Sequence, residues 1–223
     1  MQSTKARTPL NLLLIAALAF AAIQVAVKTL PHLTEASDGL VVVRELVLLV
    51  GSIALVVWLA KAGTVGLAAM GCKRPTWKTL GWGLLCALVS VIVSGLMIFA
   101  MMRTGITQNA SVLGALAIKP VWLLLLISLT AAVSEEIVFR GVILSHVASA
   151  TGRVWLGALV SLALFAAAHL SGWGWSQVLF AAVPGAVLTL FFVWKRDLGV
   201  VMIGHFLTDA LGLLSAAAQA HNL

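Results

Sequence analysis

Apolar residues run through the chain in long stretches that short polar breaks separate. Each stretch has about 17 to 25 residues, the length of a helix that crosses a bilayer, and none alternates like a membrane β-strand. We therefore predict an all-α polytopic membrane protein that forms one membrane domain over residues 1–223. About seven transmembrane helices are expected: Leu10–Leu30, Glu45–Ala62, Leu80–Met102, Val121–Ser145, Val154–Leu170, Trp175–Trp194 and Leu198–Ala218.

Composition narrows the class further. Hydrophobic residues make up 62% of the chain and charged residues only 9%, whereas soluble domains carry about 25% charged residues. This excludes an ordinary cytosolic enzyme, a disordered chain and a nucleic-acid-binding domain. The net charge of +7 is better explained by membrane topology, so the expected surroundings are a lipid bilayer and not nucleic acid.

Lys and Arg are divided unequally between alternate breaks. Cytoplasmic loops are enriched in these residues, so the unequal division predicts a cytoplasmic N-terminus and a C-terminus outside. The Ala- and Leu-rich composition suggests a bacterial protein, and hence the bacterial cytoplasmic membrane. The N-terminal side holds nine, Lys5, Arg7, Lys61, Lys73, Arg74, Lys78, Arg153, Lys195 and Arg196; the other side holds four, Lys28, Arg44, Arg103 and Lys119.

Several residues near span ends are interpreted as structural. The first span resembles a signal peptide around Ala19-Phe20-Ala21, but its apolar run continues, so we predict an uncleaved anchor. The eight tryptophans lie at or near span ends and are expected to be interfacial anchors. Arg44 and Glu45 flank the second span and are expected at the interface. His32, His146 and His221 fall in or near loops and are left out of the site.

Three motifs interrupt the apolar spans with polar side chains. A charged side chain at the centre of a membrane helix costs about 2.5–3.5 kcal/mol, so four of them facing lipid would cost on the order of 10 kcal/mol. These side chains must therefore face inward, pair or line a wet cavity. The motifs are Ser134-Glu135-Glu136-Ile137-Val138-Phe139-Arg140-Gly141, Phe165-Ala166-Ala167-Ala168-His169 and His205-Phe206-Leu207-Thr208-Asp209.

Spacing within the first motif separates its two acids. Glu136 and Arg140 are four residues apart with the acid first, the favourable order for a helical ion pair. Glu135 is turned about 100° from Glu136 around the helix, and no Lys or Arg stands three or four residues from it. Local pairing therefore accounts for Glu136, and Glu135 becomes the candidate for chemistry.

The other two motifs also repeat every four residues. His205 and Asp209 share a helix face, and so do Phe165 and His169, whose rings we expect to pack together. Each feature alone also fits a packing role. Their occurrence together favours function, because ionisable residues inside a membrane are functional candidates.

Taken in order, Glu135-Glu136-x-x-x-Arg140, Phe165-x-x-x-His169 and His205-x-x-x-Asp209 resemble the CAAX protease and bacteriocin-processing family. This family is also called the Abi or CPBP intramembrane protease family, and it includes the Ras-converting CAAX endoproteases. The resemblance covers residues 121–211, while the first three helices carry no family signal. It implies a hydrolase, an intramembrane endopeptidase acting on a membrane-anchored protein or peptide, with a catalytic cavity among the last four helices.

The resemblance also implies a role for each residue. Glu135 is expected to be the catalytic glutamate and His169 its partner in activating water. His205 and Asp209 are expected to bind or polarise the substrate carbonyl. Glu136 and Arg140 are expected to be supporting residues.

Many family members carry an asparagine where this chain has Asp209. This difference leaves open whether the site holds a cofactor. The aspartate could be protonated by burial, orient His205 or help to hold a metal. Glu135, His169 and His205 could bind zinc and leave a position for water, but the zinc signature His-Glu-x-x-His is absent. We favour a metal-free glutamate mechanism.

Two other classes stay open from the sequence. One is a non-catalytic immunity or scaffold protein that keeps the polar cluster. The other is a proton-coupled transporter that uses Glu135 and Asp209, although no repeated pair of broken helices supports transport.

Helix length places Glu135 about 22 Å from the helix start, nearer the cytoplasm, whereas the same count puts His169 too far out.

Overall fold

The structure is a computed structural model that describes residues 36–61 and 66–221. These residues form helices and no strand, as predicted. The helices in chain order are α2 Asp38–Lys61, α3 Trp77–Thr104, α4 Ala110–Ala117, α5 Val121–Glu136, the π-helix η1 Ile137–Leu144, α6 Ser145–Thr151, α7 Val154–Ala168, α8 Leu170–Trp173, α9 Trp175–Lys195 and α10 Leu198–His221.

Five helical segments are long and apolar enough to cross a membrane: Asp38–Lys61, Trp77–Thr104, Val121–Thr151, Trp175–Lys195 and Leu198–Ala220. α7 is equally apolar but has only 15 residues. The predicted span Leu10–Leu30 lies outside the described residues. The helical, polytopic class is therefore confirmed, with α4 and α8 as two short helices that the apolar pattern did not predict.

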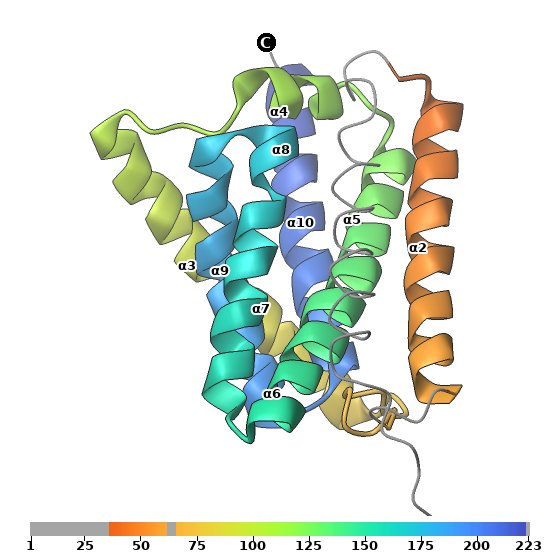
Figure 1. The fold of residues 1–223 in the computed structure, drawn as a ribbon. Coiled ribbons are helices and arrows are strands. Elements are labelled where there is room, and N and C mark those ends of the chain that lie inside the picture. Colours follow the sequence, from red (N-terminus) through yellow and green to blue (C-terminus); the bar gives the residue numbers. More distant parts are fainter. Residues whose placement is uncertain (1–35, 62–65, 222–223) are drawn as a thin grey trace, which may run out of the picture.

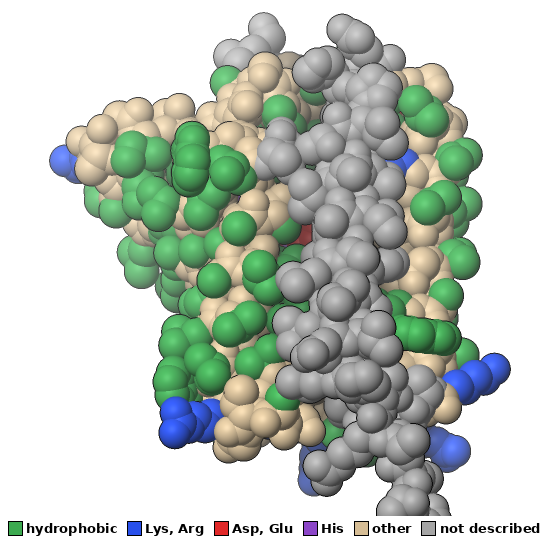
Figure 2. Space-filling view, viewed as in Figure 1, with side chains coloured by type: hydrophobic (Ala, Val, Ile, Leu, Met, Phe, Trp, Pro, Cys, Tyr) green, Lys and Arg blue, Asp and Glu red, His purple; other side chains and the backbone are tan. Residues whose placement is uncertain are grey.

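The helices form a bundle with two distinct ends (Figure 1). α10 runs through it against α3, α5 and α9, α7 packs on α9 and η1, and α2 packs on α5 at the edge. We name the end that carries α4 and α8 the cap end, and the opposite end the basic end. Figure 2 shows hydrophobic side chains over the sides and most of the visible Lys and Arg at the basic end, the pattern of a membrane-embedded surface.

Close backbone contacts hold α10 against α3. A Cβ on Gly83 would lie 2.7 Å from the side chain of Ile203, and one on Gly204 would lie 2.6 Å from Cys86 Sγ. Small residues let membrane helices approach in this way. α10 is thereby fixed at the centre of the bundle, where it carries His205 and Asp209.

The fourth predicted span is longer than expected, because α5 continues without a break through η1 and α6 to Thr151. The prediction ended it at Ser145 and placed His146 in or near a loop. His146 is instead buried, and its Nδ1 lies 2.7 Å from the carbonyl oxygen of Val142. Helical hydrogen bonding continued through polar Ser145 and His146 because their side chains bond backbone carbonyls of the same helix.

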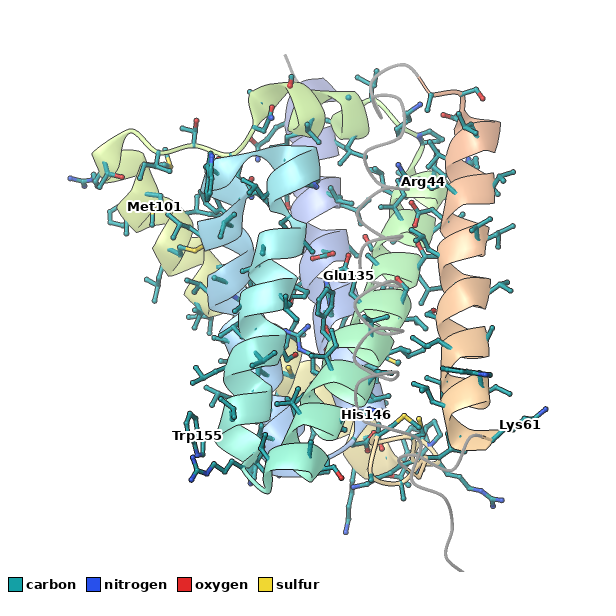
Figure 3. The ribbon with its side chains drawn as sticks, in the orientation of Figure 1. Arg44, Lys61, Met101, Glu135, His146 and Trp155 are labelled. Carbon is teal, nitrogen blue, oxygen red and sulfur yellow. The ribbon has the colours of Figure 1, made fainter. Side chains whose placement is uncertain are left out.

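The longer helix also corrects the expected depth of the site. Glu135 lies 16 residues before Thr151, and His169 lies 15 residues after Val154. At about 1.5 Å per residue both are therefore at a similar height above the turn that joins α6 to α7. Figure 3 shows Glu135 near the middle of the bundle, between Arg44 towards the cap end and Lys61 at the basic end. The site is thus central, not shifted towards the basic end.

Candidate active site

One cavity of about 640 Å³ brings the predicted chemistry together. Glu135 of α5, His169 after α7, and His205 and Asp209 of α10 all line it. A volume of this size lies within the range of about 300–1,000 Å³ typical of ligand sites. The cavity is broader than the predicted last four helices, because α2 and α3 also contribute to its wall.

The ring of Phe165 forms the junction between the two histidines. Its centroid lies 4.9 Å from that of His169 and 6.1 Å from that of His205. The Arg140 guanidinium lies over the same ring at 4.2 Å from its centroid. Gly185 of α9 makes room for the ring, since a Cβ there would lie 2.8 Å from Phe165 Cε1. The predicted packing of Phe165 on His169 is therefore present and extends to the other two motifs.

Glu136 and Arg140 form the ion pair that their spacing predicted. Arg140 Nη1 donates to Glu136 Oε1 at 2.9 Å, and both side chains are fully buried. Arg140 Nη2 also donates to the carbonyl oxygen of Gly185 at 2.9 Å. A buried charge needs such partners to remain ionised. The pair thus ties η1 to α9 beneath the cavity.

His205 is held between two carboxylates. Its Nδ1 lies 2.8 Å from Glu136 Oε1, and its Nε2 lies 3.3 Å from Asp209 Oδ2. The contact with Glu136 was not predicted, because sequence spacing carries no information about contacts between helices. Of the roles left open for Asp209, this geometry agrees with orienting His205.

His169 is fixed by its own helix. Its Nδ1 lies 2.8 Å from the carbonyl oxygen of Phe165. A carbonyl oxygen only accepts, so Nδ1 carries the proton and the lone pair of the neutral ring is on Nε2. Such a ring can accept a proton at Nε2.

Glu135 is the last residue but one of α5 and is 3% exposed. It precedes the π-helix η1, all of whose residues are buried. π-turns within α-helices are rare and are frequent at functional sites. Two carbonyls of η1 receive side-chain hydrogen bonds, Phe139 O from Ser161 Oγ at 2.7 Å and Arg140 O from Ser145 Oγ at 3.2 Å.

Sequence reasoning missed a second polar group on the cavity wall. Arg44 and Glu45 were expected at the interface, but α2 begins earlier, at Asp38, and Glu45 is 3% exposed. Arg44 donates to Glu45 Oε1, Thr130 of α5 donates to Glu45 Oε2, and both charged residues line the cavity. Their place beside an apolar run looked interfacial, and only the packing of α2 on α5 shows them inside.

The eight tryptophans differ in their exposure. Trp58, Trp77, Trp122, Trp155, Trp175 and Trp194 are exposed, which agrees with interfacial anchoring. Trp173 instead lines the cavity together with Gln177. Trp82 is half-buried and packs edge-on against Trp194. The predicted interfacial anchoring thus agrees with the exposure of six of the eight tryptophans, while Trp173 and Trp82 also contact the interior.

In residues 36–61 and 66–221, no three His, Cys, Asp or Glu side chains are grouped so that they could hold a metal ion. The suggested zinc ligands Glu135, His169 and His205 do not form such a group. We therefore derive no step that passes through a metal.

The fold and the site together define a class of protein. It is an all-helical membrane protein with a buried glutamate and two histidines around an internal cavity. Residues 117–211 match the model of the family described as type II CAAX prenyl endopeptidase Rce1-like. The match covers 95 of the 223 residues, and it supports a peptidase. No curated protein and no solved structure matches the chain.

Proposed function

We propose that the protein is an intramembrane endopeptidase that hydrolyses a peptide bond of a membrane-anchored protein or peptide. The observation that carries this is the lining of one cavity by Glu135, His169, His205 and Asp209, all within the segment that matches the protease family. The family match supports the reaction class, and the shared cavity supports a common site for these four side chains.

In the proposed reaction Glu135 accepts a proton from water, and the water oxygen attacks the carbonyl carbon of the substrate. His169 assists this activation of water through its Nε2 atom. The carbon–nitrogen bond then breaks, and the proton passes to the departing amine. General acid–base transfer of this kind contributes about 10²–10⁴-fold to a rate.

His205 is proposed to stabilise the negative charge that develops on the carbonyl oxygen. A carboxylate oxygen faces each of its ring nitrogens, and the ring donates to both only as an imidazolium. A fixed positive charge beside the carbonyl oxygen acts where charge develops in the transition state. Glu136 and Arg140 position this ring and Phe165.

The proposed location is the bacterial cytoplasmic membrane, with the N-terminus in the cytoplasm and the C-terminus outside. The described Lys and Arg support this orientation through the rule that cytoplasmic loops are enriched in them. At the cap end are Arg103, at the end of α3, and Arg44 and Lys119, which are paired with acidic residues. At the basic end are Lys61, Lys73, Arg74, Lys78, Arg153, Lys195 and Arg196.

The direct test compares membrane peptides from cells that make the wild-type chain or a variant. Glu135→Gln, His169→Ala and His205→Ala are each expected to abolish the fragments that the wild-type chain produces, while the variant still accumulates in the membrane. His146→Asn is the control, because His146 is as buried as Glu135 and His205 but lies outside the cavity.

The control should retain the fragments. If all three site variants produce the same fragments as the wild type, catalysis is not the function, and the non-catalytic alternative replaces it.

A further inference from the structure

Positive charge gathers in one patch at the basic end, away from the cavity. Five cations lie just before α3, in its first turn and at the turn from α9 to α10: Lys73, Arg74, Lys78, Lys195 and Arg196. We name these five residues the basic patch, and none of them lines the cavity. Arg44 and Lys119 at the cap end, by contrast, form ion pairs with acidic side chains. The basic patch is therefore a feature that the active-site chemistry does not explain.

Hydrogen bonds join the two segments that carry the basic patch. Lys73 Nζ donates to the carbonyl oxygen of Lys195 at 3.0 Å. Thr79 Oγ1 of α3 donates to Asp197 Oδ2 at 3.0 Å. The five cations are therefore held on one surface, although the two segments are far apart in the sequence.

The basic patch carries more positive charge than its surroundings neutralise. Asp197 is the single acidic residue in the ranges 66–80 and 190–200. Both of its oxygens accept from neutral donors, Oδ2 from Thr79 Oγ1 and Oδ1 from Gly199 N at 2.9 Å. Within the described part of the chain, no Asp or Glu forms an ion pair with a cation of the patch. An anion from outside the protein would therefore complement this surface.

Tryptophan rings border the basic patch. Lys195 Nζ lies 3.2 Å from the centroid of the Trp82 ring and 3.3 Å from that of Trp194. Lys78 is four residues before Trp82 and therefore shares its face of α3. Indole rings at the ends of membrane helices lie at the level of the lipid headgroups. The positive charge is thus fixed at the depth where lipid phosphates are found.

Exposed apolar side chains continue from these rings along α3 and α9, which pack against each other. Leu85 follows Trp82 by three residues, Leu190 precedes Trp194 by four, and both are exposed. A soluble anion would meet only the cations, whereas the acyl chains of a lipid also cover this apolar surface. Clusters of about four to eight Lys and Arg beside membrane helices are typical of binding to anionic lipids. We propose that the basic patch binds the headgroup of an anionic phospholipid whose acyl chains lie along α3 and α9.

A lipid bound in this way links parts of the fold that are separate in the sequence. Its phosphate bridges the segment before α3 and the turn into α10, the helix that carries His205 and Asp209. Binding should therefore raise the melting temperature of the protein, and salt should weaken binding because it screens charge. This inference goes beyond the proposed function and does not depend on it.

The experiment titrates the purified full chain with phosphatidylglycerol or with the zwitterionic phosphatidylcholine, and native mass spectrometry measures the bound lipid. The variant Arg74→Gln/Lys78→Gln removes two exposed cations of the basic patch. The matched control Lys61→Gln/Arg153→Gln removes two exposed cations from the same end of the bundle but outside the patch. Both variants should accumulate, because the changed side chains are exposed.

We expect the wild type to bind phosphatidylglycerol more tightly than phosphatidylcholine. Arg74→Gln/Lys78→Gln should bind phosphatidylglycerol about 25-fold more weakly, because each cation beside an anionic headgroup contributes about fivefold. The control should bind like the wild type. Should Arg74→Gln/Lys78→Gln fail to accumulate, Lys195→Gln measures the loss for a cation of the patch on α9.

Equal binding of the two lipids by the wild type would overturn the proposal. Equal losses in the two double variants would also overturn it, because they would indicate a general attraction to surface charge. Glycerol phosphate, added as the free headgroup, should not displace the bound lipid. Displacement at equal concentration would contradict the proposal, because the site would then bind soluble phosphates.

Discussion

Glu136 is the residue through which α5, η1 and α10 are linked at the site. One of its oxygens accepts from Arg140 Nη1 and lies 2.8 Å from His205 Nδ1. It therefore neutralises a buried guanidinium and fixes the orientation of a histidine on another helix. The adjacent residue Glu135 lines the cavity.

Glu136→Gln should damage folding first. Breaking a buried ion pair leaves a charge without compensation and costs about 3–5 kcal/mol. We expect less protein in the membrane and a lower melting temperature in detergent. The double variant Glu136→Gln/Arg140→Met should recover accumulation, because no buried charge is left, but not fragment formation, because His205 loses a charged partner.

A Glu136→Gln protein with wild-type melting temperature and no activity would contradict this assignment and give Glu136 a direct chemical role.

The ring of Phe165 touches two histidines and an arginine that three different helices carry. Gly185→Ala would place a Cβ 2.8 Å from that ring. Overpacking of this kind costs about 1–3 kcal/mol, and the displaced ring would shift both imidazoles. We expect a lower melting temperature and fewer fragments.

The matched control is Gly81→Ala in α3, where nothing lies within 4 Å of the added Cβ. Alanine favours a helix over glycine by roughly 0.5–1 kcal/mol, so this variant should be at least as stable as the wild type. Equal losses in both variants would show that the Phe165 contact is not the cause.

The attachment of α2 to α5 depends on a polar contact within the membrane. Thr130 donates to Glu45 Oε2, and Glu45 is buried. Thr130→Val removes the donor at nearly constant shape and should lower stability by about 1–3 kcal/mol. Combined with Glu45→Gln in a double-mutant cycle measured by unfolding in detergent, the losses should be non-additive. Additive losses would indicate that the two side chains do not interact.

Helical periodicity explains which parts of the site could be foreseen. Pairs four residues apart, such as Glu136 with Arg140 and Phe165 with His169, follow from helix geometry alone. The contact of His205 with Glu136 could not be foreseen, because it depends on how α10 packs. η1 was also hidden, since the hydrogen bond that Phe139 O receives from Ser161 of α7 arises only in the assembled bundle.

At the scale of the whole molecule, the matched segment 117–211 does not make the cavity by itself. α2 supplies Arg44 and Glu45 to its wall, and α3 supplies residues from Ser90 to Ile98. Fragment 106–223 made alone should therefore form no substrate fragments. Production together with fragment 1–105 should restore them, because the break falls in the exposed segment before α4.

Membrane peptides from cells that make one or both fragments provide the measurement, with Glu135→Gln in the larger fragment as the control. Processing by 106–223 alone would show that the first helices are dispensable.

The π-helix makes chain length critical at one place in the fold. Its wider turns take up residues that an α-helix would not need, and this widening sets the phase at which α6 continues. One further residue inserted into Ile137–Leu144 would rotate everything after it by about 100°, and His146 would leave the interior. Related sequences should therefore vary in length at the turns between helices but keep a constant number of residues between Glu135 and Ser145.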